Sequence, residues 1–135
     1  DLEHEGKPYN EKMLEKIHKH KTGKLLTASV LAGGRAGGAQ GKTFEVLERY
    51  GECIGLAFQI ADDILDLTST TEELGKDAKS DLKKGKATYP SLLGMEASKK
   101  RARSLLDEAI QTLQPFGARG EMLALIARLI VERST

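Results

Sequence analysis

The chain has 135 residues, of which 39% are hydrophobic and 30% are charged, and its formal net charge is +1. This length corresponds to one domain that can bury a useful core. The balanced charge gives no indication of nucleic acid or a membrane surface as a partner. No apolar run approaches the roughly 20 residues that span a bilayer, and the first ten residues resemble neither a signal nor a transit peptide. We therefore expect a soluble, cytoplasmic protein.

Helical periodicity dominates the sequence and no segment alternates as a strand does, so the predicted fold class is all-α. Asn10 is a suitable N-cap for a first helix whose apolar row is interrupted at Gly33-Gly34. After a glycine-rich connector, Thr43 is the predicted cap of a second helix that continues to Leu67. We expect residues 68–88, which are polar, to form a long loop with at most one short helical turn.

Pro90 suits the first turn of a long amphipathic helix that ends before Pro115. We expect a last helix over residues 118–133 whose apolar face is core, formed by Met122, Leu125, Ile126, Leu129 and Ile130. Four such helices form either a small bundle or a part of a larger one.

Cysteine and histidine give no sign of a metal site. Cys53 is the single cysteine, which excludes a disulfide framework and a thiolate cluster and favours a reducing compartment. His4, His18 and His20 have no Cys or Glu at metal-binding spacing and stand among lysines and glutamates. We expect all three histidines at the surface.

The second predicted helix carries three carboxylates within five residues, Asp62, Asp63 and Asp66. At about 100° per residue, Gln59, Asp62 and Asp66 fall on the side opposite the apolar residues, with Asp63 beside them. Like charges four apart on a helix repel by a few tenths of a kcal/mol. The cluster fits either a fully solvated face or Mg²⁺, which binds through one or two carboxylates, waters and the oxygens of a substrate phosphate.

Three lysines are candidates for contact with a polyphosphate. Lys21 falls on the apolar side of the first helix, so its ammonium either points toward the bundle or reaches back to solvent. Lys76 and Lys86 stand in the polar segment that follows the aspartates. Each alone fits a solvated lysine. Together they suggest a diphosphate held between Mg²⁺ and ammonium groups, which share the charge of a departing group.

Four motifs in this order resemble the C-terminal half of the trans-isoprenyl diphosphate synthases, most of all the short-chain geranylgeranyl and farnesyl diphosphate synthases of bacteria, cyanobacteria and plastids. They are KTG at 21–23, GLAFQIADDILD at 55–66, ELGKD at 73–77, and Asp81 followed by KATYPSL at 86–92. The resemblance covers essentially the whole chain. It implies a helical bundle that is part of the isoprenoid-synthase fold, with residues 1–135 as the C-terminal portion of one synthase domain, and a plastid location if the source is a plant.

The resemblance also implies roles for single residues. Asp62, Asp63 and Asp66 would form the family's second aspartate-rich motif and bind Mg²⁺, with Asp62 as the direct ligand and Asp81 as a support through water. Contacts to the substrate would come from Lys21, Thr22, Gln59, Lys76 and Lys86, and the catalytic group would be Lys21, Thr22 and Gln59. The implied reaction ionises an allylic diphosphate, couples it to isopentenyl diphosphate and releases a proton, giving geranylgeranyl or farnesyl diphosphate.

The chain departs from the family pattern because it has no first aspartate-rich motif, no arginine pair after such a motif and no upstream site for isopentenyl diphosphate. The sequence also begins at Asp1 rather than Met. We therefore expect the C-terminal half of a synthase that is inactive without its N-terminal half and that forms a homodimer, as the family does. Three alternatives remain: a non-catalytic partner subunit of a prenyl synthase, a terpene cyclase, and a helical interaction module.

Overall fold

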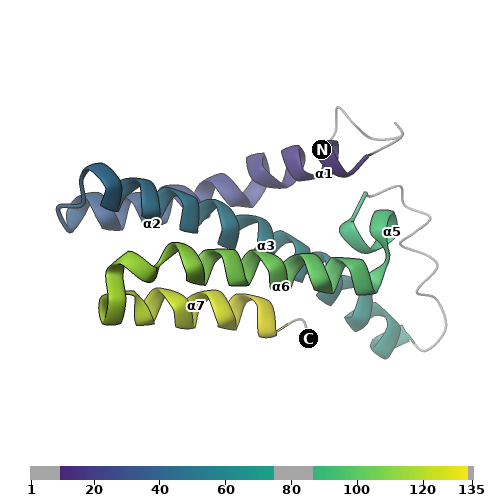
Figure 1. Ribbon diagram of the computed structural model, residues 1–135. Coiled ribbons are helices and arrows are strands. Elements are labelled where there is room, and N and C mark those ends of the chain that lie inside the picture. Colours follow the sequence, from purple (N-terminus) through teal and green to yellow (C-terminus); the bar gives the residue numbers. More distant parts are fainter. Residues whose placement is uncertain (1–9, 75–86, 134–135) are drawn as a thin grey trace.

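The computed structural model describes residues 10–74 and 87–133, and every element in these ranges is helical, as predicted (Figure 1). The α-helices are α1 (Glu11–His18), α2 (Lys24–Ala36), α3 (Gly41–Leu74), α5 (Tyr89–Leu93), α6 (Met95–Thr112) and α7 (Glu121–Glu132). A π-helical segment, η2 (Lys19–Gly23), joins α1 to α2, and a 3-10 segment, η3 (Gln114–Gly120), joins α6 to α7.

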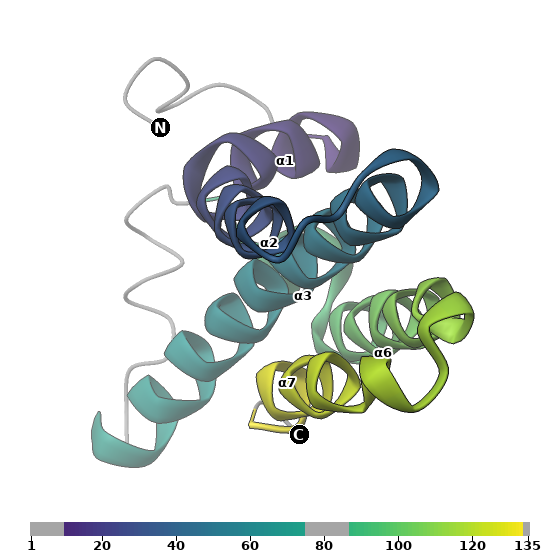
Figure 2. The ribbon, with the colours of Figure 1, turned by 90° about the vertical axis from the view of Figure 1, so that its left-hand side faces the viewer.

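Helix α3 is the central element. It lies between α1 and α2 on one side and α6 and α7 on the other (Figure 2). Two core clusters share this helix: Leu56, Ile60 and Ile64 pack with α1, α5 and α6, and Tyr50, Cys53 and Ile54 pack with α6 and α7. From the sequence we expected one apolar side on this helix. In the structure most residues from Tyr50 to Ala61 are buried on all sides, and the only charged residue among them is Glu52. This stretch is therefore enclosed almost all round.

Three helix boundaries of the first half differ from prediction, namely the end of α2 and both ends of α3. Asn10 does cap α1, since its Oδ1 accepts the Met13 N–H at 2.9 Å. The glycine pair at 33–34 does not end the helix, which continues to Ala36. Helix α3 begins at Gly41 and extends to Leu74, so the loop predicted from residue 68 is wrong over 68–74. The Thr68 hydroxyl donates to the Ile64 carbonyl at 3.1 Å, which satisfies a polar side chain without leaving the helix.

The long helix predicted from Pro90 is divided in two at Gly94. Helix α5 begins with a capping box, in which Thr88 Oγ1 accepts the Ser91 N–H at 3.2 Å and Ser91 Oγ accepts the Thr88 N–H at 2.9 Å. Gly94 then has φ +86°, a backbone conformation that glycine adopts without the steric cost that a Cβ brings. The chain thus changes direction there before α6 begins.

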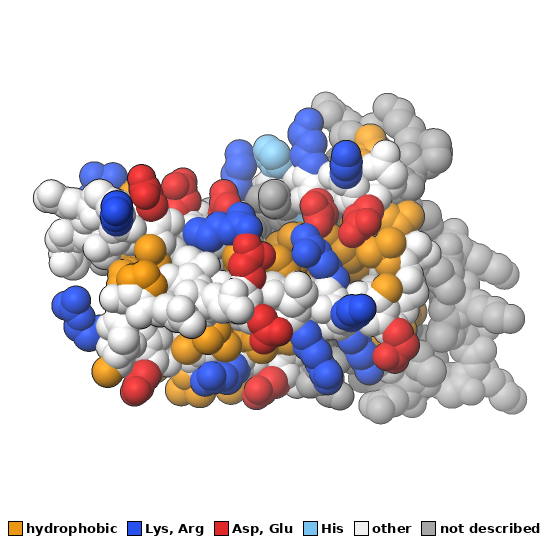
Figure 3. All heavy atoms as spheres, in the orientation of Figure 1, with side chains coloured by type: hydrophobic (Ala, Val, Ile, Leu, Met, Phe, Trp, Pro, Cys, Tyr) orange, Lys and Arg blue, Asp and Glu red, His pale blue; other side chains and the backbone are white. Residues whose placement is uncertain are grey.

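Most of the α7 face predicted as core is exposed, and of its five residues only Ile130 packs against the core clusters. Met122, Leu125, Ile126 and Leu129 are 66, 48, 40 and 59% exposed, and α7 instead packs on α3 and α6 through Ala127, Val131 and Ile130. Hydrophobic side chains therefore gather along the edge of the molecule where α7 lies (Figure 3). No helix in the described ranges is both long enough and apolar enough to cross a membrane.

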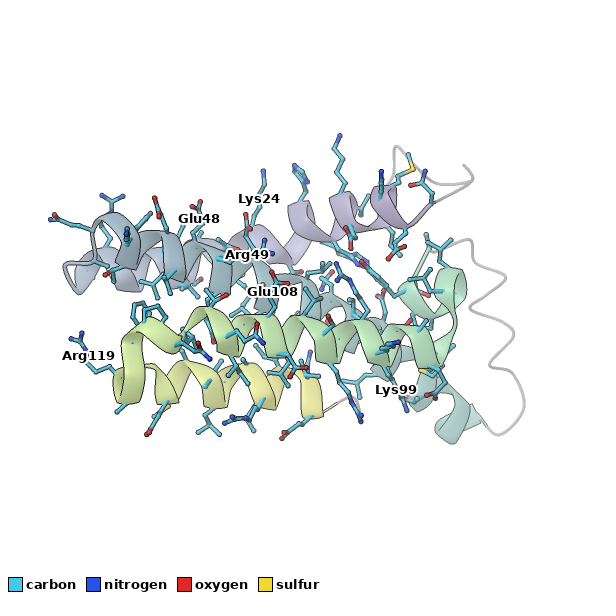
Figure 4. The ribbon with its side chains drawn as sticks, in the orientation of Figure 1. Lys24, Glu48, Arg49, Lys99, Glu108 and Arg119 are labelled. Atoms are coloured by element: carbon cyan, nitrogen blue, oxygen red, sulfur yellow. The ribbon has the colours of Figure 1, made fainter. Side chains whose placement is uncertain are left out.

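Helix α3 makes different kinds of contact with the helices on its two sides. Toward α6, Arg49 forms an ion pair with Glu108 at the surface (Figure 4), a kind of contact worth at most about 1 kcal/mol. Toward η2 the backbones meet directly, because a Cβ placed on Gly55 would lie 2.8 Å from the Gly23 Cα. One turn earlier, a Cβ on Gly51 would lie 2.9 Å from the Thr27 Cα. Glycine at 51 and 55 therefore lets η2 and α2 lie against α3.

We expect Gly55→Ala to destabilise the protein by about 1–3 kcal/mol, because the added methyl group meets backbone that cannot rotate away. Gly33→Ala is the matched control, since nothing lies within 4 Å of a Cβ at this position. The control should stabilise α2 by about 0.5–1 kcal/mol through the lower flexibility of alanine. Urea unfolding measures both values, and equal effects of the two substitutions would contradict the close backbone contact.

Candidate functional site

The three aspartates lie on α3 just beyond its enclosed stretch, and the structure exposes them to different degrees. The side chain of Asp62 is 43% exposed and that of Asp63 is 16% exposed, whereas Asp66 is an exposed residue. Across residues 10–74 and 87–133, no three His, Cys, Asp or Glu side chains converge on a point that could hold a metal ion. Oxygen ligands from a substrate would therefore have to complete a metal site here, as is usual for Mg²⁺.

Asp62 already has a cation beside it. Its Oδ1 accepts a hydrogen bond from the Arg133 guanidinium at 2.6 Å, and the same guanidinium lies 4.5 Å from the centre of the Phe58 ring. Charge-assisted contacts of this kind are among the stronger hydrogen bonds in proteins. The guanidinium shows that the Asp62 carboxylate can receive a positive charge from the side of α7. Asp62 is therefore paired with Arg133 at the end of α7 in this structure, and its role as a metal ligand stays a prediction.

Asp63 turns instead toward the interior. Its Oδ2 accepts the backbone N–H of Tyr89 at 3.0 Å and lies 3.5 Å from His18 Nε2. Burial raises the pKa of Asp63 to about 6, while the Tyr89 N–H and the charge of Lys21 act in the opposite direction. This carboxylate therefore joins three segments that are far apart in sequence.

His18 is buried, which corrects the prediction that all three histidines lie at the surface. Only 5% of the residue is exposed, and its ring stacks on Tyr89 with the ring centroids 5.4 Å apart. Burial lowers its pKa to about 4, and the nearby charge of Lys21 adds to this effect. The sequence contains one signal for this burial: His18 follows Leu14, the other buried residue of α1, by four positions and so shares its helix face. His20 is exposed, as predicted, and His4 lies outside the described residues.

The KTG motif forms the end of the π-helical segment η2. Such segments are rare and occur often at functional sites. Lys21 is exposed and Thr22 is half-buried, and the charge of Lys21 acts on both His18 and Asp63. Lys21 therefore lies on the side of the bundle that carries the aspartates. Gln59 follows Gly55 by one turn of α3 and is only 6% exposed.

Several predicted site residues lie outside the described residues, namely Lys76, Asp81 and Lys86, and their roles stay predictions. The chain is described again from Ala87. Two residues later, the N–H of Tyr89 reaches Asp63. The first residues described after this segment therefore lie beside the aspartates of α3. Sequence reasoning missed Tyr89, His18 and Arg133 as neighbours of the aspartates.

Residues 1–128 match the family model described as Polyprenyl synthetase. The chain belongs to this family. It is 44% identical to the farnesyl diphosphate synthase of Escherichia coli (strain K12), over 99% of this chain and 46% of that protein. It is 47% identical to the geranylgeranyl diphosphate synthase of Cyanophora paradoxa, over 99% of this chain and 45% of that protein.

A solved structure of the same fold is the geranyltransferase of Helicobacter pylori, which was crystallised with magnesium and isoprenyl diphosphate. It superposes with a TM-score of 0.74 at 32% sequence identity, over 98% of this chain and 43% of that one. The chain therefore spans about half the length of the relatives that it matches.

We expect His18 to make folding of this chain sensitive to acid. Its folded pKa of about 4 lies below the ordinary value of 6.5, so its contribution to stability is complete above pH 6.5 and is lost as the pH falls toward 4. In His18→Gln the loss of stability between pH 7 and pH 4 should be smaller by up to about 3 kcal/mol. Urea unfolding at both pH values tests this expectation.

Asp63 contributes with the opposite sign, because its folded pKa is raised. An identical pH dependence of stability in wild type and His18→Gln would contradict the burial of a neutral imidazole at this position.

Proposed function

We propose that this chain is the C-terminal portion of a trans-prenyltransferase that condenses an allylic diphosphate with isopentenyl diphosphate to give geranylgeranyl or farnesyl diphosphate. The observation that carries the proposal is the position of Asp62 and Asp66 at the solvent-facing end of the enclosed stretch of α3, the helix against which the KTG segment packs. The farnesyl and geranylgeranyl diphosphate synthases among the relatives support this substrate class. Because the chain spans about half of their length, an N-terminal half would complete the enzyme.

Asp62 and Asp66, which are one helical turn apart, are the proposed ligands of Mg²⁺. Asp63 lies between them in the sequence, and we propose a separate role for it. When bound, Mg²⁺ neutralises charge on the diphosphate and so assists its departure. Lys21 binds the diphosphate from η2, together with Lys76 and Lys86 from the segment before α5. Lysines and a metal ion that together stabilise the charge of a leaving group are typical of diphosphate chemistry.

We propose that the buried side chains of the site surround the hydrocarbon part of the substrate and do not bind its diphosphate. Thr22 is half-buried and Gln59 is almost fully buried, so we assign them to the wall beside the developing allylic cation. Exclusion of water from this wall protects a carbocation from hydrolysis. The exposed apolar face of α7 and the exposed Leu25 of α2 leave surface for the N-terminal half and for a second subunit of a homodimer. A cytoplasmic location is proposed for the enzyme.

We expect the full-length protein to convert an allylic diphosphate and isopentenyl diphosphate into a longer diphosphate when Mg²⁺ is supplied. Asp62→Ala should lower kcat at least about a hundredfold, since it removes an electrostatic contact needed in the transition state. Asp107→Asn removes an exposed carboxylate of α6 and is the matched control, with activity close to wild type. Chromatography of the dephosphorylated products measures both rate and chain length.

Two results would contradict the proposal. One is the absence of any elongated product from the full-length protein, which would favour a non-catalytic subunit. The other is full activity in Asp62→Ala, which would remove the metal site from α3.

A further inference from the structure

Three segments of the chain meet at the Asp63 carboxylate. Helix α3 contributes the aspartate, the end of α1 contributes His18 with Nε2 at 3.5 Å, and the start of α5 contributes the Tyr89 N–H at 3.0 Å. The His18 ring also stacks on the Tyr89 ring, so the two outer segments contact each other as well. Each pair among the three segments is therefore joined at this point.

The surroundings of Asp63 differ from those of Asp62, whose hydrogen-bond partner is an exposed side chain at the end of α7. Its side chain is 16% exposed, against 43% for the side chain of Asp62. Its Oδ2 is already an acceptor for the backbone of Tyr89, a fully buried residue. A buried backbone N–H that loses its acceptor costs about 1–3 kcal/mol. If Asp63 turned outward to a metal, this N–H would lose the acceptor that it has in the structure.

The segments joined at Asp63 are those that carry the proposed substrate contacts. Lys21 and Thr22 follow His18 by three and four residues, and Asp62 and Asp66 flank Asp63 on α3. A shift of the α1 and η2 segment relative to α3 would move the Lys21 ammonium away from the diphosphate. Misplacement of a charged group by even about 1 Å can lower a rate strongly.

We propose that Asp63 is a positioning residue, not a magnesium ligand, and that its carboxylate holds the KTG segment and the start of α5 in register with Asp62. This inference rests on the proposed function for the metal and the diphosphate. The contacts of Asp63 themselves do not depend on it.

The substitution Asp63→Asn distinguishes a positioning role of Asp63 from a role as a magnesium ligand. The amide oxygen of Asp63→Asn accepts the Tyr89 N–H as the carboxylate does, so the three segments stay joined. A neutral amide is a poor substitute for a carboxylate in binding Mg²⁺, which prefers hard anionic oxygens. Asp63→Ala removes the acceptor altogether and leaves the Tyr89 N–H unpaired.

The first measurement is calorimetric titration of the full-length protein with inorganic pyrophosphate in the presence and absence of Mg²⁺. We expect Asp63→Asn to keep the Mg²⁺-dependent Kd within about threefold of wild type, and Asp62→Asn to weaken it at least about tenfold. Equal weakening by the two substitutions would overturn the proposal and make Asp63 a ligand.

The second measurement is hydrogen exchange of the segments around Tyr89 and Lys21, without metal or pyrophosphate. Asp63→Ala should speed exchange in both segments, and Asp63→Asn should restore slow exchange, with Asp107→Asn as the control. Unchanged exchange in Asp63→Ala would overturn the positioning role. If wild type binds no pyrophosphate, the proposed function fails, while this exchange measurement still decides whether Asp63 holds the segments.

Discussion

Helix α3 is enclosed by other helices between Tyr50 and Ala61, and the chain places three carboxylates where that enclosure ends. A carboxylate at such a boundary either reaches water or finds donors inside, because an unpaired buried charge is costly. Asp63 finds the Tyr89 N–H, whereas Asp62 and Asp66 stay nearer the solvent. The three carboxylates of one motif therefore have different surroundings.

The close contact of η2 with α3 depends on the same central helix. Gly23 and Gly55 bring two backbones together, and the π-helical segment places Lys21 and Thr22 directly before this contact. Gln59 follows one turn later on α3. Small residues at the contact therefore set the distance between the two segments that carry the proposed catalytic side chains. The position of these segments is fixed by packing before any ligand binds.

Local patterns in the sequence were sufficient for the fold class and the Asn10 cap, because each depends on residues a few positions apart. They were insufficient where a distant segment decides. His18 is buried because Tyr89 stacks on it, and no local pattern of α1 reveals that partner. The face of α7 is apolar yet exposed, because periodicity shows which residues share a face but not what covers it. The roles of Lys76 and Lys86 rest on family resemblance alone.

We propose different roles for Asp62 and Asp63, and the position of the metal ion distinguishes the two. Crystals of the full-length protein grown with pyrophosphate and Mn²⁺, an anomalous scatterer that accepts the same oxygen ligands, would locate the ion. We predict anomalous density about 2.1 Å from an oxygen of Asp62, with Asp63 still bonded to the Tyr89 N–H. Density at the same distance from an Asp63 oxygen, with that hydrogen bond broken, would contradict the account.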